Sequence, residues 1–168
     1  MEQPAKAQFC LWIAVVTLAI SVGGNLFQRT VIDPVWSGSP PESVQAFSSE
    51  TSLLSGLKRF HQNPIYLFGL VCLVASPFLA WNRPAMRNWL LTAAVIYVGI
   101  VLVTVLYFYP MNGVLGLLGA HPSTDAATLI ATTHRWIFAD RIRFILRVAS
   151  FLCALRAMSL SGTTAISR

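Results

Sequence analysis

The sequence predicts an all-α integral membrane protein, a bundle of four transmembrane helices with a short amphipathic surface helix in the first external loop. Only 11% of the 168 residues are charged, against roughly 25% in an average soluble domain. Apolar residues make up 55% of the chain and gather in four runs. Each run has about the 20 residues that a helix needs to cross a bilayer. This excludes a soluble domain, a disordered tail and a disulfide scaffold, and it predicts one membrane domain over residues 1–168.

The expected spans are residues 9–28, 64–81, 89–109 and 134–157. Because hydrocarbon offers the backbone no water to bond, segments that cross it must be helical. Pro64 suits the first turn of the second span, and Pro110 is expected to end the third. Ser123 or Thr124 is expected to cap the last helix, with Asp125 favourable to its N-terminal dipole.

The first link between spans contains two different segments. Residues 33–43 are rich in Pro, Ser and Gly, which predicts an irregular loop. Leu53, Leu57 and Phe60 then recur at helical spacing, with basic residues beside them. This pattern predicts a short amphipathic helix on the membrane surface.

Basic residues predict the orientation in the membrane. The N-terminal segment, the link after the second span and the C-terminal tail contain Lys6, Arg83, Arg87, Arg156 and Arg168. The third link, residues 109–133, has no Lys or Arg, and the basic residues of the first link are offset by acids. We therefore expect both termini in the cytoplasm and both long links outside.

Charge and cysteine usage exclude further functions. The net charge of +6 is concentrated in one C-terminal segment, which does not favour nucleic acid, since that partner needs an exposed basic face. Cys10, Cys72 and Cys153 form no CxxC motif and are expected to be buried thiols. The histidines and acids lack metal-ligand spacing, and nucleotide, serine-hydrolase and haem motifs are missing from the sequence. No metal site is expected.

The fourth span contains several ionisable residues, each of which costs on the order of 3 kcal/mol at mid-membrane. Trp136, Asp140 and Arg143 follow one another at i, i+4 and i+7, which places them on one face of a helix. Arg147, four residues further, extends this face, while His134 lies nearly opposite. Asp140 and Arg143 are expected to form an ion pair facing the bundle. Either the pair only joins helices, or the surplus of arginines receives an acidic or anionic group.

Other polar residues lie at the span ends that are predicted to be external. They are Asn25, Gln28, Tyr109 and Asn112. These residues are expected to converge on the outer half of one bundle. Asn25 and Gln28 also have a plainer interpretation as interhelical hydrogen-bonding groups. Arg141 is expected to extend toward the lipid headgroups.

Short motifs resemble a known family. Residues 110–115, PMNGVL, resemble the Pro-x-Asn-x-x-Leu element after the third helix of a small four-helix membrane family. That family is mostly of unknown function and includes the fungal anthrone oxygenases. Its last helix usually reads Trp-x-x-x-Asn-x-x-Arg, where this chain has Trp136, Asp140 and Arg143. Trp36, after a glycine-rich first helix, adds to the resemblance, which covers most of the chain.

The resemblance implies an enzyme that oxidises an anthrone or a quinol-like aromatic with molecular oxygen and no evident cofactor. Such a reaction needs a base, an oxyanion site and a dry aromatic pocket. Arg143 with Asn112 would stabilise the oxyanion, and Asp140 or His134 would be the base. Because the family usually has Asn at that position, Asp140 can instead be only the counter-ion of Arg143. The implied substrate-binding residues are Trp136, Asn112, Arg147, Gln28, Asn25, Tyr109 and Trp36.

Two other classes of function stay open. One is a non-catalytic module that binds or transports a small amphiphilic anion through the surplus arginines. The other is a structural subunit whose buried charges pair with a partner chain. Four spans without an evident repeat do not favour a transporter, unless a homo-oligomer supplies the missing helices.

Overall fold

The structure is a computed structural model that describes residues 5–119 and 121–162. These residues form helices and connecting loops, with no strand among them, which confirms the predicted all-α class. Four of the described helical stretches are long and apolar enough to cross a membrane, as in a multi-pass membrane protein. They are Ala7–Ser37, Thr51–Leu79, Pro84–Val114 and Ala126–Ser161.

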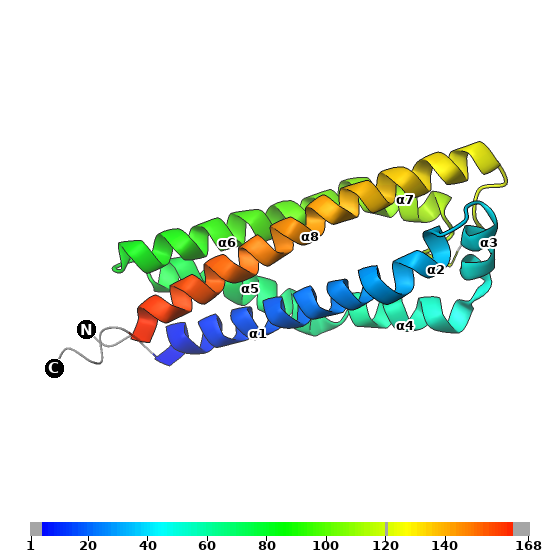
Figure 1. Cartoon of the computed structure of the whole chain (residues 1–168). Helices are drawn as coiled ribbons and strands as arrows, with labels where there is room; N and C mark the ends of the chain where they lie inside the picture. Colours follow the sequence, from blue (N-terminus) through cyan, green and yellow to red (C-terminus); the bar gives the residue numbers. More distant parts are fainter. Residues whose placement is uncertain (1–4, 120, 163–168) are drawn as a thin grey trace. The chain divides into compact units, whose positions relative to one another are not determined.

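The described elements follow one another along the chain as drawn in Figure 1. They are α1 (Ala5–Phe27), the π-helical turn η1 (Gln28–Ile32), α2 (Asp33–Ser37), α3 (Glu42–Ser49), α4 (Thr51–His61), α5 (Pro64–Leu79), α6 (Pro84–Val103), the π-helical turn η2 (Thr104–Phe108), α7 (Tyr109–Val114) and α8 (Ala126–Gly162). All four helical stretches are longer than the expected spans, because helical structure continues beyond each apolar run.

The first link is more helical than its composition indicated. The amphipathic helix is present as α4, with Leu54 as its buried residue. The expectation of an irregular loop over residues 33–43 was wrong, because α2 occupies residues 33–37 and α3 begins at Glu42. Pro34 fits the first turn of α2, where a missing N–H breaks no helical hydrogen bond.

Pro110 was expected to end the third helix, and this expectation was wrong. It lies in the first turn of α7, directly after η2. There the N–H of Tyr109 donates to the carbonyl of Thr104, five residues earlier. A proline lacks an N–H, and its ring crowds the carbonyl four residues before it, so a wider π turn lets the helix continue. Pro34 follows η1 in the same way.

The cap of α8 also differs from the expectation. The carboxylate of Asp125 accepts hydrogen bonds from the backbone N–H groups of Ala127 at 3.2 Å and Thr128 at 3.1 Å. Ser123 Oγ instead accepts from the Asp125 N–H at 3.2 Å. Asp125 is therefore the N-cap, and a charged acceptor at this place also suits the helix dipole.

Contacts divide the chain into two compact units, each built from parts of several helices. The first unit contains the chain up to Gly23, Pro64–Ile100 and the chain from Ile145 onward. The second unit contains Gly24–Asn63 and Val101–Phe144. The single membrane domain and the cytoplasmic termini stay predictions, and residues 1–4 and 163–168 lie outside the described part of the chain.

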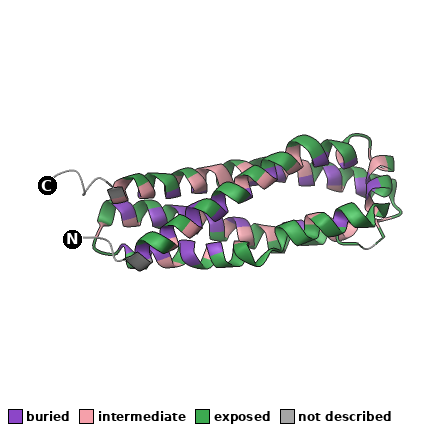
Figure 2. Cartoon of the chain, turned by 90° about the horizontal axis from the view of Figure 1, so that it is seen from below, coloured by how far each residue is buried: buried purple, intermediate pink, exposed green. Residues whose placement is uncertain are grey.

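The first unit buries small residues at its helix contacts, together with larger ones such as Leu11, Leu73 and Leu90. Ala14, Ala93, Ala154 and Ala157 are fully buried, and Ser150 Oγ donates to the Ala93 carbonyl at 2.9 Å. Small side chains let helix backbones approach closely, which is how helices associate in lipid. Many other large apolar side chains lie on the outer faces of the helices, where Figure 2 shows exposed residues.

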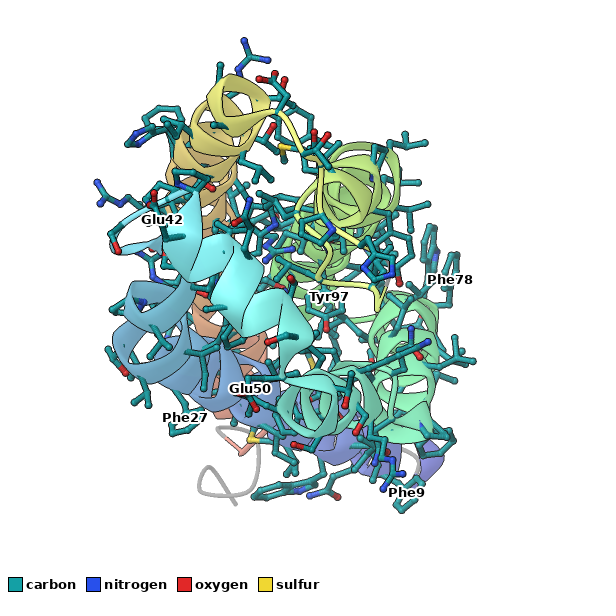
Figure 3. The ribbon with its side chains drawn as sticks, turned by 90° about the vertical axis from the view of Figure 1, so that its right-hand side faces the viewer. Phe9, Phe27, Glu42, Glu50, Phe78 and Tyr97 are labelled. Atoms are coloured by element: carbon teal, nitrogen blue, oxygen red, sulfur yellow. The ribbon has the colours of Figure 1, made fainter. Side chains whose placement is uncertain are left out.

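The second unit packs through large side chains. Its core contains Ile32, Trp36, Val44, Phe47, Leu54, Phe108, Leu115, Leu129 and Trp136. Phe27 at the end of α1 points outward, as do Phe9 and Phe78 of the first unit (Figure 3). Such exposed rings suit a surface covered by lipid rather than by water.

Candidate functional site

Three aromatic side chains from different elements meet in the second unit. The ring of Trp136 on α8 lies 5.1 Å from that of Trp36 on α2 and 5.3 Å from that of Phe108 in η2, both edge to face. Each of the three is at most 3% exposed. The indole N–H of Trp136 donates to Asn112 Oδ1 at 2.7 Å. These contacts make a buried aromatic cluster.

The guanidinium group of Arg143 lies against this cluster. Its central carbon is 3.8 Å from the centre of the Phe108 ring and 5.6 Å from that of Trp136. Its Nε and Nη2 donate to Asp140 Oδ1 at 3.0 and 2.5 Å, and its Nη1 donates to Thr104 Oγ1 at 3.4 Å. All three nitrogens of Arg143 are thus engaged by side chains of the same unit.

Asp140 lies between two arginines. Besides Arg143 it faces Arg29 of η1, whose Nη1 is 3.8 Å from Asp140 Oδ2 and donates to the Asp140 carbonyl at 3.3 Å. The Asp140 side chain is 1% exposed and that of Arg29 is 24% exposed. The guanidinium group of Arg29 also lies 5.0 Å from the ring centre of Phe144. A carboxylate that is buried to this extent needs such cations around it.

A second buried carboxylate, Asp33, begins α2. Its Oδ1 accepts a hydrogen bond from the indole N–H of Trp36 at 3.2 Å and another from the amide of Gln28 at 3.4 Å. Asp33 is 5% exposed. Unlike Asp140, it forms no ion pair within 4.0 Å with any described residue.

Both carboxylates line one partly open pocket of about 270 Å³. Its lining residues are Arg29, Asp33, Pro34, Ser37, Ile137, Asp140 and Arg141, all in the second unit. The volume is slightly below the range of about 300–1,000 Å³ that is usual for drug-sized ligands. Five of its seven lining residues are polar or charged, so the pocket suits a small molecule that presents at least one polar or anionic group to them.

The structure brings together most of the predicted site residues. Those in the connected network are Asp140, Arg143, Trp136, Asn112, Gln28 and Trp36. His134 and Tyr109 lie on exposed surfaces, Tyr109 being 43% exposed. Asn25 is buried, and its Oδ1 accepts no hydrogen bond from the described residues. Arg147 belongs to the first unit, where it interacts electrostatically with Tyr66.

Sequence reasoning missed Arg29, Asp33 and Arg141. The first two were counted only as loop charges, because the apolar run that marks the first span ends before them. A usable signal was present, since Arg29, Asp33 and Trp36 have the same i, i+4, i+7 spacing as Trp136, Asp140 and Arg143. Arg141 was expected to extend away to the lipid headgroups, yet it lines the pocket while remaining exposed.

Comparison with known proteins gives one match. The model of a family described as Anthrone oxygenase matches residues 57–153, more than half of the chain. This range includes Asn112, Trp136, Asp140 and Arg143, and it excludes η1 and α2. No curated protein and no solved structure matches the chain. The motifs, the four candidate spans and this match agree, and the chain belongs to the anthrone oxygenase family.

Proposed function

We propose that the protein is a membrane-embedded oxygenase that converts an anthrone, or a similar lipophilic phenolic aromatic, into the corresponding quinone with molecular oxygen. The observation that supports this most is the pocket of the second unit, in which two acids and two arginines face one cavity beside a buried aromatic cluster. Family membership indicates the substrate class.

The reaction requires a base and a group that stabilises an oxyanion, and the pocket contains acids and arginines for these roles. An anthrone is a carbon acid, and loss of one proton from its methylene group leaves an electron-rich oxyanion delocalised over the rings. This oxyanion transfers electrons to oxygen directly. Overall, one anthrone and one O₂ give one anthraquinone and one water, because the methylene carbon loses the four electrons that O₂ gains.

We assign the stabilisation of the oxyanion to Arg29 rather than to Arg143 and Asn112. Arg29 lines the pocket, whereas the other two residues do not belong to its lining. Their hydrogen bonds are made to Asp140 and Trp136, so their role is to hold those side chains. A preorganised cation at the developing oxyanion is an effective way to stabilise the transition state.

The charge count of the pocket favours the enzyme over an anion-binding module. The latter depended on one acid against four arginines of the last helix, which left positive charge over. Asp33 supplies a second acid, so the two acids and two arginines of the lining balance. Such a pocket does not need a permanently anionic ligand. It is compatible with an anthrone, which is neutral before it loses a proton.

The test is oxygen uptake by the purified full-length protein in lipid nanodiscs with anthrone as substrate. We expect one O₂ consumed per anthrone, and one oxygen-18 atom from labelled O₂ in the quinone product. Arg29→Gln should lower the turnover number roughly 100- to 1,000-fold, the cost of removing one oxyanion donor. Arg59→Gln removes an exposed arginine of α4 and should have no effect.

Oxygen uptake no faster than in protein-free nanodiscs would refute the proposed activity for this substrate class. Equal turnover in Arg29→Gln and Arg59→Gln would instead refute the role of Arg29. A rise in melting temperature on adding anthraquinone, without turnover of anthrone, would favour the binding module.

A further inference from the structure

The two carboxylates of the pocket belong to segments with the same spacing. Asp33 is followed by Trp36, and Asp140 by Arg143, each three residues later on a helix. In both segments this third residue donates to the carboxylate, through an indole N–H at 3.2 Å or a guanidinium N–H at 3.0 Å. The geometry is the same, but one donor is neutral and the other is a cation.

The remaining neighbours increase this difference. A second cation, Arg29, approaches Asp140 at Oδ2. Asp33 receives its second hydrogen bond from the neutral amide of Gln28, again at Oδ1. Within the described residues, Asp33 Oδ2 therefore accepts no hydrogen bond and faces no ion-pair partner.

Two carboxylates in unlike surroundings divide the roles of an acid–base site. Adjacent cations hold a carboxylate in its ionised form and weaken it as a proton acceptor, whereas neutral donors in a buried place do not. The charged groups around the pocket are Arg29 of η1 and Asp140 and Arg141 of α8, with Arg143 behind Asp140.

We propose that Asp33 is the general base of this pocket, and that Asp140 serves as the fixed counter-ion of Arg143 and Arg29. This inference rests on the proposed function, and it adds a catalytic residue that lies outside the matched part of the chain. The only acidic group that the motifs placed at the site, Asp140, is thereby assigned a positioning role.

The proposed reaction uses Asp33 twice on one carbon. Asp33 first takes a methylene proton of the anthrone, and the electron pair of the broken C–H bond moves to the carbonyl oxygen near Arg29. The resulting oxyanion combines with O₂ at the same carbon, and Asp33 returns its proton to the peroxide anion. Asp33 then takes the second C–H proton, the O–O bond breaks, and the departing hydroxide receives that proton as water.

The proton step is measured separately from oxygen chemistry by deuterium exchange. Full-length protein in nanodiscs is mixed with anthrone in D₂O without oxygen, and loss of the methylene proton signal is followed by NMR. We expect the protein to accelerate exchange, and Asp33→Asn to lower the protein-dependent rate about 100- to 10,000-fold, the usual contribution of a general base. Asn keeps an acceptor for Trp36 and Gln28, and the melting temperature reports whether the variant is folded.

Two further variants complete the test. Glu42→Gln removes an exposed carboxylate of α3, labelled in Figure 3, and should exchange at the wild-type rate. Asp33→Glu keeps the carboxylate but moves it by about one bond, which should cost on the order of 100-fold. This variant decides the question if Asp33→Asn does not fold.

A wild-type exchange rate in either folded Asp33 variant would overturn the assignment of the base. The proposed function would survive that result if oxygen uptake with anthrone were still observed. Conversely, wild-type protein that neither exchanges nor oxidises an anthrone would refute both, so the two failures are distinguishable.

Discussion

The two units of this protein share helices α1, α6 and α8, but their cores differ in composition. In the first unit, alanines and Ser150 let helices approach, and a side-chain hydrogen bond to a backbone carbonyl joins α8 to α6. In the second unit, tryptophans, two phenylalanines and a buried ion pair help to fill the core, and both described π turns lie there. Small-residue packing serves association in lipid. Buried charges cost free energy in a membrane, and their presence indicates a functional site.

The largest effect is expected from Asp140→Asn, which leaves buried Arg143 without its counter-charge. Breaking a buried pair in this way costs about 3–5 kcal/mol of stability. Equilibrium unfolding in mixed micelles measures it. The double variant Asp140→Asn/Arg143→Met should recover part of the loss, because it removes both charges. A loss of stability no greater than that of Ser150→Ala would contradict the conclusion that the buried ion pair distinguishes the second unit from the first.

Trp136→Phe is expected to cost about 1–3 kcal/mol, since it keeps an aromatic ring but leaves the Asn112 carbonyl without its donor. The same substitution at Trp12, which is 54% exposed on α1, is the matched control and should change stability little. Thermal unfolding of the two variants side by side checks this. Equal melting temperatures would show that the aromatic cluster contributes no specific hydrogen bond.

Ser150→Ala tests the first unit and is expected to cost about 0.5–1.5 kcal/mol, the net value of an ordinary hydrogen bond. The Ala93 carbonyl lies within α6, so it keeps its helical partner and is not left unpaired. Anthrone exchange and oxidation should stay at the wild-type rate. A large loss of activity in this folded variant would mean that the first unit takes part in the site.

The smallest effect concerns the cap of α8. The hydrogen bond from the Thr128 side chain, with those from the backbone N–H groups of Thr128 and Ala127, lowers the pKa of Asp125 below its ordinary value of 3.8. Its contribution to stability is therefore complete above pH 3.8 and is lost as the pH falls through the lowered pKa. Hydrogen exchange of the first amides of α8 should accelerate in that range. Asp125→Asn should remove this pH dependence, and an unchanged dependence would exclude Asp125 as its source.

The sequence by itself determined the all-α class, the four candidate spans and the face of α8 that contains Trp136, Asp140 and Arg143. These follow from composition and from helical periodicity, which are local properties. The contact between Asp140 and Arg143 was predictable for the same reason, since residues three apart on a helix always lie close together.

Only the tertiary structure decided which other residues join that pair. Arg29 meets Asp140 across 111 positions of sequence, and Trp36 meets Trp136 through the packing of two helices. Their placement depends on η1, a π turn that carries the first helix past its apolar run and on through Pro34. An apolar pattern cannot show such a turn, because one wide turn changes which side of a helix every later residue occupies. Asp33 was counted as a loop charge because it follows the apolar run, although the fold places it in the pocket.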